Sequence, residues 1–337
     1  HGPSSRPRGV ARRTAGGWRS GRAAALMLAA VALVGCGGSA ETADEDGAAA
    51  SADARPLTVI FQKQKDPAAI REQAEALAAE LSERLGGREV EPVVPSDYGA
   101  SVQALVSGQA DAAFVSALPF LLARRDGDAR LILAEVRPDL QGERRTSYDS
   151  VFVAPADSDV TSMADVVARA GELRMAFTST TSTSGYVMAY SRLVDEGVLA
   201  PEQDPQEAFG DVIFAGGYTQ ALDAVLEGRA DVAAVSAYTV EGPSADVYTT
   251  AEERERLAVV GRTPSVPTHL VCVRGGLPEA DAEALAEALL AISAERPDLL
   301  EQVYGAAELT RVDPAEHVAA AELAIERLGI ELDRFGG

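Results

Sequence analysis

Cysteine, lysine and histidine are scarce in this sequence, and their scarcity excludes several classes of site. The 337 residues contain two cysteines, two lysines and three histidines. Apart from His1, the histidines are His269 and His317, and no His or Cys residues stand at metal-ligand spacing. The Gly-x-Ser-x-Gly motif of a nucleophile elbow is also missing. We therefore expect no metal, no cofactor and no enzyme activity; a Ser–His hydrolase would require one of these two histidines beside Ser184.

Positive charge is scarce as well. Lys and Arg number 30 against 52 Asp and Glu, which gives a net charge of −22. Six of the arginines lie in residues 1–22, so removal of residues 1–35 would leave 24 basic and 52 acidic residues, or −28. Such a chain lacks the basic face that nucleic acid requires. Any anion site must be built locally from backbone and hydroxyl groups, because the long-range field repels the ligand.

Long hydrophobic runs are absent. The run Ala23–Val34 falls short of the roughly 20 residues that a membrane span needs, but it has the length of a signal-peptide core. It ends in Leu-Val-Gly-Cys36, which resembles the cleavage box of bacterial lipoproteins. We predict a lipoprotein signal peptide over residues 1–36 with Cys36 lipid-modified, the alternative being a chance cysteine after a cleaved signal. Only Cys272 then remains, which excludes an internal disulfide.

The stretch that follows contains small and acidic residues and no large apolar ones. Residues 37–56 are therefore predicted to form a flexible tether. Beyond it, apolar strand-length segments such as Leu57–Phe61 alternate with helical patterns such as Ile70–Leu85. This alternation favours an α/β fold with mostly parallel sheets and helices on both faces. The polar loop Gln62–Pro67 follows a strand, where α/β proteins bind ligands, although it could equally be a solvated turn.

An internal repeat indicates two lobes of like construction. Residues 103–117 (QALVSGQADAAFVSA) and 223–237 (DAVLEGRADVAAVSA) are offset by 120 positions and share eight of fifteen residues. Each copy reads as a helix end, a glycine stop and an apolar strand. The helix–Gly–strand pattern that many proteins share would explain three or four matches, not eight.

A run of hydroxyl residues, Thr178–Thr183, follows the predicted strand Leu173–Phe177 and precedes a predicted helix from Ser184. Ser182, Thr183, Ser184 and Gly185 therefore lie at a helix start, where free N–H groups and the positive helix end favour an anion. Rotatable hydroxyls add donors for an oxyanion. A helix N-cap alone is the plainer interpretation, but one hydroxyl would suffice for that.

Several of these segments together resemble the phosphonate/phosphite solute-binding proteins of ABC importers, known as the PhnD type. The resemblance covers most of residues 57–278, and its most specific element is the Ser-Thr-Ser-Gly-Tyr run after a strand. The segments that carry it are Asp97-Tyr98, residues 104–115 with Leu118-Pro119-Phe120, Tyr148-x-Ser150, Ser182–Tyr186, and Asp231–Val235.

The resemblance implies a two-lobed periplasmic-binding-protein fold, similar to type II, that closes about a hinge on a phosphorus oxyanion. Residues 57–150 with 268–337 would form lobe 1, and residues 151–267 would form lobe 2. By position, Ser182, Thr183 and Ser184 would hold the anion's oxygens. Tyr98 and Tyr148 would reach in from the other lobe.

Departures from the family pattern affect the expected cargo. Tyr218 stands where members usually carry His, and a phenol can still donate a hydrogen bond. Members that bind an aminoalkyl phosphonate use carboxylates where this chain has Tyr238 or Ser236, and His269. An ammonium would be buried there without a counter-charge. We therefore expect phosphate, phosphite or a small alkyl phosphonate; His269 could equally be a structural residue facing the hinge.

Two alternatives stay open. The same fold could bind another anion such as a sulfonate, since a phosphorus anion that keeps its proton needs an acceptor and Asp97 is the one nearby candidate. The chain could also be the ligand-sensing subunit of a membrane signalling system. We otherwise expect a lipid-anchored, extracytoplasmic monomer that is either periplasmic or on the cell surface. It would serve an ABC permease and ATPase.

Overall fold

The computed structural model of the chain describes residues 55–62, 67–95 and 97–329. The predicted signal peptide, Cys36 and nearly all of the predicted tether lie outside these residues, as do both lysines. The described residues all belong to one compact unit, Ala49–Gly337. Among them, no helix is both long enough and apolar enough to cross a membrane.

The first lobe is built on a seven-stranded sheet. Its strand order is β12-β4-β11-β3-β1-β2, with β5 paired to β4. Strands β1, β2 and β3 are parallel, whereas β11, β4 and β12 run antiparallel to their neighbours. The strands are β1 Leu57–Phe61, β2 Val90–Val93, β3 Ala112–Val115, β4 Arg130–Pro138, β5 Arg144–Arg145, β11 Leu270–Val273 and β12 Glu308–Thr310.

The second lobe is built on a five-stranded sheet with the order β10-β6-β9-β7-β8. Its strands β7, β8 and β9 are parallel, and β6 and β10 are antiparallel. The strands are β6 Ser147–Pro155, β7 Arg174–Phe177, β8 Asp211–Phe214, β9 Val232–Ser236 and β10 Leu257–Pro267. The order β8-β7-β9-β6 repeats the order β2-β1-β3-β11 of the first lobe, as the internal repeat predicted.

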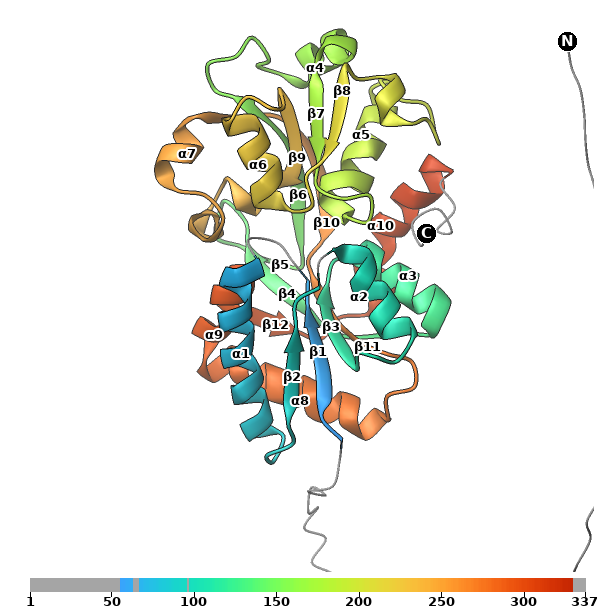
Figure 1. Cartoon of the computed structure of the whole chain (residues 1–337), viewed down its shortest axis with the longest axis vertical. Coiled ribbons are helices and arrows are strands. Elements are labelled where there is room, and N and C mark those ends of the chain that lie inside the picture. Colours follow the sequence, from blue (N-terminus) through green and yellow to red (C-terminus); the bar gives the residue numbers. More distant parts are fainter. Residues whose placement is uncertain (1–54, 63–66, 96, 330–337) are drawn as a thin grey trace, which may run out of the picture. The chain divides into compact units, whose positions relative to one another are not determined.

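Helices cover both faces of each sheet, because the central strands carry apolar side chains on both faces and both faces must be shielded from water. Figure 1 shows α1 and α9 on one side of the first sheet and α2 and α3 on the other. The helices are α1 Pro67–Arg84, α2 Tyr98–Val106, α3 Ala117–Gly127, α4 Met163–Arg169, α5 Ala189–Asp195, α6 Tyr218–Leu226, α7 Ala251–Glu255, α8 Glu279–Glu295, α9 Pro297–Tyr304 and α10 Pro314–Leu328. Short turns are η1 Ala170–Glu172, η2 Thr183–Met188, η3 Pro205–Glu207, η4 Ala237–Thr239 and η5 Pro243–Val247.

One aspartate in each repeat copy fixes the same strand pair in its lobe. The Asp111 N–H donates to the Thr58 carbonyl at 2.8 Å, and the Asp111 carboxylate accepts from the Thr58 N–H at 3.1 Å. Asp231 makes the equivalent pair of bonds with Arg174, both at 2.8 Å. The Ala-Asp pair that both copies share therefore has a structural role, because its aspartate joins β3 to β1 in the first lobe and β9 to β7 in the second.

The chain crosses from the first sheet to the second before β6 and returns after β10. These two strands pair with each other, from Ser147 opposite Pro267 to Pro155 opposite Leu257. Their register shifts between Thr263 and Val266, where Ser265 adopts a left-handed φ of 66°. The predicted α/β fold with two lobes joined by a hinge is confirmed.

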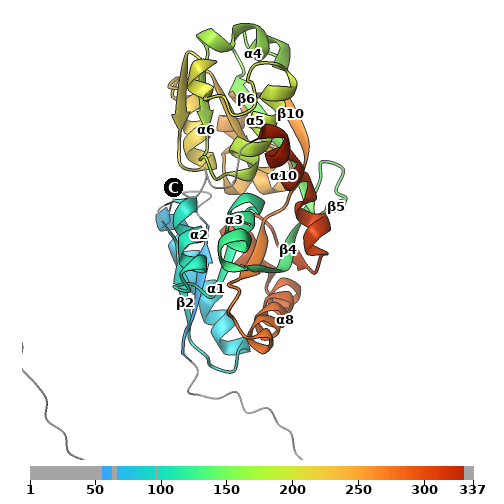
Figure 2. The same cartoon turned by 90° about the vertical axis from the view of Figure 1, so that its right-hand side faces the viewer.

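The last helix, α10, contacts both lobes. It packs on β10, η2 and α5 of the second lobe and touches α3 of the first (Figure 2). Its residues fall in the range 268–337 that the sequence analysis assigned to lobe 1. An Arg124–Glu322 ion pair joins it to α3, and His317 Nε2 lies 3.1 Å from the Thr268 carbonyl oxygen.

Candidate functional site

Four helices, two from each lobe, begin close to one point between the lobes. They are α2, α3, η2 and α6, and each follows a strand of its sheet. The Leu118 N–H at the start of α3 donates to Thr183 Oγ1 of η2 at 2.8 Å. Ser184 Oγ of η2 lies 2.9 Å from the Tyr218 hydroxyl at the start of α6. The N-terminal ends of these helices supply positive potential at this point without a cation.

The hydroxyls of the predicted anion-binding run have distinct roles. Ser182 is the N-cap, and its Oγ accepts from the Gly185 N–H at 3.1 Å. Thr183 accepts from α3 of the other lobe, as described above. Ser184 bonds to Tyr218 and, at 2.8 Å, to Ser236 Oγ. The turn η2 is a π-helix, a form that often marks functional sites, rather than the α-helix expected from Ser184.

Gly185 is required by a close approach within this turn. A Cβ at Gly185 would lie 2.0 Å from Thr178 Oγ1, far inside van der Waals contact. Thr178 directly follows β7 and begins the run, and its backbone N–H donates to the Gly185 carbonyl at 3.3 Å. The Thr178 side chain therefore packs directly over the glycine and holds η2 against β7.

The second lobe contributes a group of buried hydroxyls that we call the lobe-2 hydroxyl cluster: Tyr148, Ser184, Tyr218 and Ser236. Ser150 supports it by donating to the Ser184 carbonyl at 2.8 Å. Burial raises the pKa of Tyr148 well above its usual value, and Tyr218 adds to the rise, while Ser184 and Ser236 act in the opposite direction. Among the described residues, the Tyr148 hydroxyl makes no hydrogen bond.

Tyr148 lies on β6 of the five-stranded sheet. The sequence analysis expected it to reach in from the lobe opposite Ser184, and that expectation is wrong. The crossing strand begins at Ser147, before the predicted border at residue 150, because β6 pairs with β10 over its whole length. Tyr98, by contrast, does come from the first lobe, where it begins α2.

The first lobe contributes the lobe-1 donor cluster, defined as Gln62, Tyr98, Ser101 and Ser116. All four side chains are buried, with at most 1% of their surface exposed. Ser101 Oγ and Ser116 Oγ make no hydrogen bond within the described part of the chain, and Gln62 Nε2 and Tyr98 OH, which lie beside each other, make none of standard geometry there. Buried polar groups in proteins are nearly always paired, so four unpaired ones together mark a site that receives a polar ligand.

Sequence reasoning missed Gln62, Ser101 and Ser116 as site residues, although the sequence carried a signal for Gln62 and Ser116. Ser116 is the repeat counterpart of Ser236, and Tyr98 is the counterpart of Tyr218 at the same offset of 120 residues. Gln62 opens the polar loop that the sequence placed near the ligand. Ser101 stands one helical turn after Tyr98, on the same face of α2.

Tyr238 and His269 lie beside the lobe-2 hydroxyl cluster. The Tyr238 ring packs edge-on against Tyr148 at 4.9 Å, and its hydroxyl is 3.4 Å from His269 Nδ1. Burial, together with the charge of Arg137, lowers the pKa of His269 to about 3, so the imidazole is neutral at physiological pH. His269 and Tyr238 are therefore both neutral, as the sequence analysis assumed.

A buried ion pair stands next to them that the sequence analysis did not identify. Arg137 lies 3.1 Å from Glu135 Oε2, and both side chains are 3% exposed or less. The guanidinium also stacks over the Tyr238 ring, with its carbon 3.8 Å from the ring centre. Glu135 therefore compensates the positive charge of Arg137 beside the hydroxyls.

Asp97, the proton acceptor suggested from the sequence, has a structural task. Its carboxylate accepts from the Ala100 N–H at 2.9 Å and caps α2. The residue is exposed, unlike the clusters. The hydroxyl oxygens of the two clusters have lone pairs with which they can accept a hydrogen bond from a protonated ligand.

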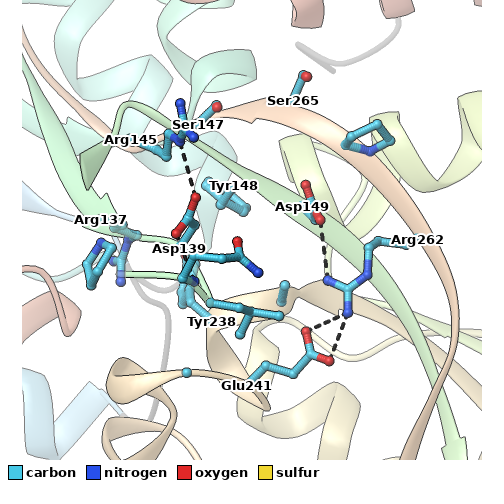
Figure 3. Close-up of a pocket in the computed structure, with 16 residues that line it drawn as sticks. Arg137, Asp139, Arg145, Ser147, Tyr148, Asp149, Tyr238, Glu241, Arg262 and Ser265 are labelled. Carbon is cyan, nitrogen blue, oxygen red and sulfur yellow. Dashed lines mark hydrogen bonds and ion pairs between the residues drawn. The ribbon is translucent and has the colours of Figure 1, made fainter. Parts of the chain in front are cut away.

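A cavity of about 530 Å³ opens at the hinge (Figure 3). Tyr148 and Tyr238 line it, and its charged side chains are paired with one another. Arg262 bonds to Asp149 at 3.3 Å and to Glu241 at 2.7 Å, while Arg145 bonds to Asp139 at 3.2 Å. Because these charges satisfy each other, this cavity does not offer the unpaired donors that the two clusters present.

Among the described residues, no group of three or more His, Cys, Asp and Glu side chains is placed to hold a metal ion. The buried Cys272 is a free thiol, and burial raises its pKa to about 12. The chemistry that the clusters can perform is therefore hydrogen bonding by neutral donors.

Comparison with known proteins identifies relatives in sequence and in fold. The chain is 30% identical over 154 residues to the phosphate-import protein PhnD of Mycolicibacterium smegmatis, a match that spans 45% of this chain and 46% of that relative. A binding-protein component of an ABC phosphonate transporter from Pseudomonas aeruginosa has a similar fold. Its TM-score is 0.71 at 18% identity, over 85% of this chain and 90% of that one.

PhnD1 of Prochlorococcus marinus, solved in complex with methylphosphonate, also shares the fold. Its TM-score is 0.66 at 18% identity, over 82% of this chain and 98% of that one. The profile of the family described as the periplasmic substrate-binding protein of phosphonate ABC transporters matches residues 59–317. The chain belongs to this family of periplasmic substrate-binding proteins.

Proposed function

We propose that this chain is the extracytoplasmic solute-binding subunit of an ABC importer and captures a phosphorus oxyanion between its lobes. The observation that carries the proposal is the pair of buried clusters, one from each lobe, that present neutral hydrogen-bond donors at the starts of four helices. A ligand that bonds to both clusters would favour the closed arrangement over an open one.

Neutral donors suit an anion in this protein. Hydrogen bonds to a charged group contribute roughly 1.5–3 kcal/mol each, so a handful supports micromolar binding or better after the costs of association. The binding residues that we propose are Ser182, Thr183, Ser184 and Gly185 of the run, the tyrosines Tyr98, Tyr148, Tyr218 and Tyr238, and His269. Gln62, Ser101, Ser116 and Ser236 are added on the structural grounds given above.

The cargo that this site fits has no amine. Tyr238, Ser236 and His269 are neutral, and the nearby carboxylates are ion-paired with arginines, Glu135 with Arg137, and Asp149 and Glu241 with Arg262. A buried ammonium would lack a counter-charge there. Phosphate, phosphite and small alkyl phosphonates satisfy this condition, and tighter binding of 2-aminoethylphosphonate than of these anions would contradict it.

The cellular setting belongs to the same proposal. A lipid on Cys36 would hold the protein on the outer side of the cell membrane, where it would deliver cargo as a monomer to a permease driven by an ATPase. Growth of cells on the anion, with and without Cys36→Ala, tests the anchor separately from binding.

Isothermal titration of the purified chain tests binding directly. Phosphate, phosphite, methylphosphonate, 2-aminoethylphosphonate and sulfate are titrated in turn. We expect submicromolar binding of one amine-free phosphorus anion, reduced about 100-fold or more in the double variant Thr183→Ala with Ser184→Ala, because two charge-assisted bonds are lost. Thr180→Ala, an exposed position in the same run, is the matched control and should bind normally. An absence of heat with every phosphorus anion would overturn the proposal.

A further inference from the structure

The two clusters differ in how far their hydrogen bonds are already made. In the lobe-2 hydroxyl cluster, Ser184 is bonded to both Tyr218 and Ser236. In the lobe-1 donor cluster, all four side chains keep an unpaired polar atom. The first lobe therefore has more buried polar atoms for a ligand to pair with than the second.

Gln62 is held so that only its amide nitrogen is left to act. Its backbone N–H donates to the Phe114 carbonyl at 3.1 Å, which places it beside the end of β3. Its side-chain Oε1 accepts from the Ser116 N–H at 2.9 Å. With the oxygen committed, Nε2 offers two N–H donors next to the Ser116 hydroxyl and can accept nothing.

The other two members reach the same place from α2. Tyr98 and Ser101 are three residues apart in one helix, so their side chains share a face. Burial raises the pKa of the Tyr98 phenol well above its usual value, Tyr218 of the second lobe adds to the rise, and Gln62 of the first lobe lowers it, so the phenol interacts with both clusters. Ser101 Oγ is fully buried without the backbone bond that a helical serine often makes.

These four side chains form an oxyanion seat on the first lobe, separate from the run Ser182–Ser184. A tetrahedral anion with three oxygens can direct them to one lobe and present its fourth substituent to the other. If that substituent is a methyl group or a hydrogen, buried donors of the first lobe stay unpaired. If it is an oxygen, they are satisfied.

Resting on the function proposed above, we propose that the lobe-1 donor cluster receives the fourth oxygen of its cargo, so that the protein selects inorganic phosphate over methylphosphonate and phosphite. Phosphate carries a P–O group where methylphosphonate carries P–CH₃ and phosphite carries P–H. The proton that phosphate keeps near neutral pH is accepted by a serine or tyrosine oxygen, since each hydroxyl can accept as well as donate.

The selectivity follows from leaving donors buried and unpaired. One such group lowers affinity by about 5- to 150-fold. We therefore expect phosphate to bind about 10- to 100-fold more tightly than methylphosphonate or phosphite, measured by titration of the purified chain at one pH and salt concentration. Equal or tighter binding of either three-oxygen anion would overturn the inference.

Variants of the first lobe test which residues determine the preference for phosphate over methylphosphonate. Gln62→Met keeps the length of the side chain and removes its donors together with the acceptor of the Ser116 N–H, and Ser101→Ala removes a single hydroxyl. Each should weaken phosphate about 5-fold or more and weaken methylphosphonate less, which brings the ratio of the two affinities toward one. Ser107→Ala, an exposed serine at the end of the same helix, is the matched control and should preserve the ratio.

The outcomes separate this inference from the function on which it rests. Binding of methylphosphonate by a variant shows that the variant is folded, so a changed ratio then reports selectivity alone. An equal loss for both anions would show that the seat is merely structural and would overturn the inference. If the wild-type chain binds no phosphorus anion at all, the proposed function itself fails.

Discussion

Individual hydroxyls in this protein are identical in chemistry and different in task. Ser182 caps a turn, Thr183 accepts a bond from the other lobe, and Ser184 faces two further hydroxyls. The seven consecutive hydroxyl residues Thr178–Ser184 therefore do not form a uniform anion-binding surface. Only the surroundings of each side chain decide whether its donor remains for a ligand.

His269 gives a prediction at this scale. Its pKa is about 3 in the folded protein and about 6.5 when unfolded, so at intermediate pH the unfolded state binds a proton that the folded state does not. The free energy of unfolding therefore falls as pH drops below about 6.5, by at most about 1.4 kcal/mol per pH unit from this group. Denaturant unfolding of His269→Gln between pH 7 and 5 should show a shallower fall than the wild type. Parallel curves would contradict a neutral, buried imidazole.

At the scale of elements, the strands and the repeat could be read from the sequence, and the turn η2 could not. Apolar strands and helix spacing follow from burial, and the eight repeated residues follow from two lobes with the same strand order. The π-helix depends on Thr178 packing over Gly185, a contact between residues whose closeness no periodicity reports.

The predictability of the site has the same limit. Tyr218 and Ser184 could be placed from a family pattern, whereas Ser101 could be found only once its missing partner was visible. Glu135 was hidden in a strand that reads as apolar, because its charge is matched by Arg137 two residues later on the same face. Residues that act through an unpaired atom leave no trace in composition or spacing.

Gly185→Ala tests the packing of η2 on β7. The new methyl carbon would lie 2.0 Å from Thr178 Oγ1, which is a steric clash, so the turn or the threonine must move. We expect a loss of about 1–3 kcal/mol in the free energy of unfolding, measured by denaturant titration, and weaker phosphate binding. Thr178→Ala in the same chain should restore part of the loss. Gly171→Ala is the control, since its nearest neighbour would be 3.9 Å away, and it should leave both quantities nearly unchanged.

At the scale of the whole molecule, the lobes are joined by direct contacts as well as by any ligand. Besides the Leu118–Thr183 bond, Ser244 of the second lobe donates to the Gly305 carbonyl of the first. The same carbonyl accepts from Arg137 Nη1 at 3.0 Å. These contacts lie outside both clusters and join the two lobes directly.

Ser244→Ala should therefore act on the lifetime of the complex without touching the ligand. The loss of one neutral hydrogen bond, about 0.5–1.5 kcal/mol, predicts dissociation of phosphate that is about 2- to 10-fold faster in stopped-flow measurements. Ser158→Ala removes a serine-to-carbonyl bond of 2.8 Å within one loop and should leave the rate unchanged. Identical rates in the two variants would show that the Ser244 contact does not hold the lobes together.

The enclosure of the two clusters has a consequence for the transfer of cargo. Because the donors come from both lobes and are buried, an anion bound as proposed would leave only when the lobes part. The protein that receives the anion consequently has no need to compete for it atom by atom. It would need only to separate the lobes, and the cargo, which would then be bonded to one lobe alone, would be released at that place.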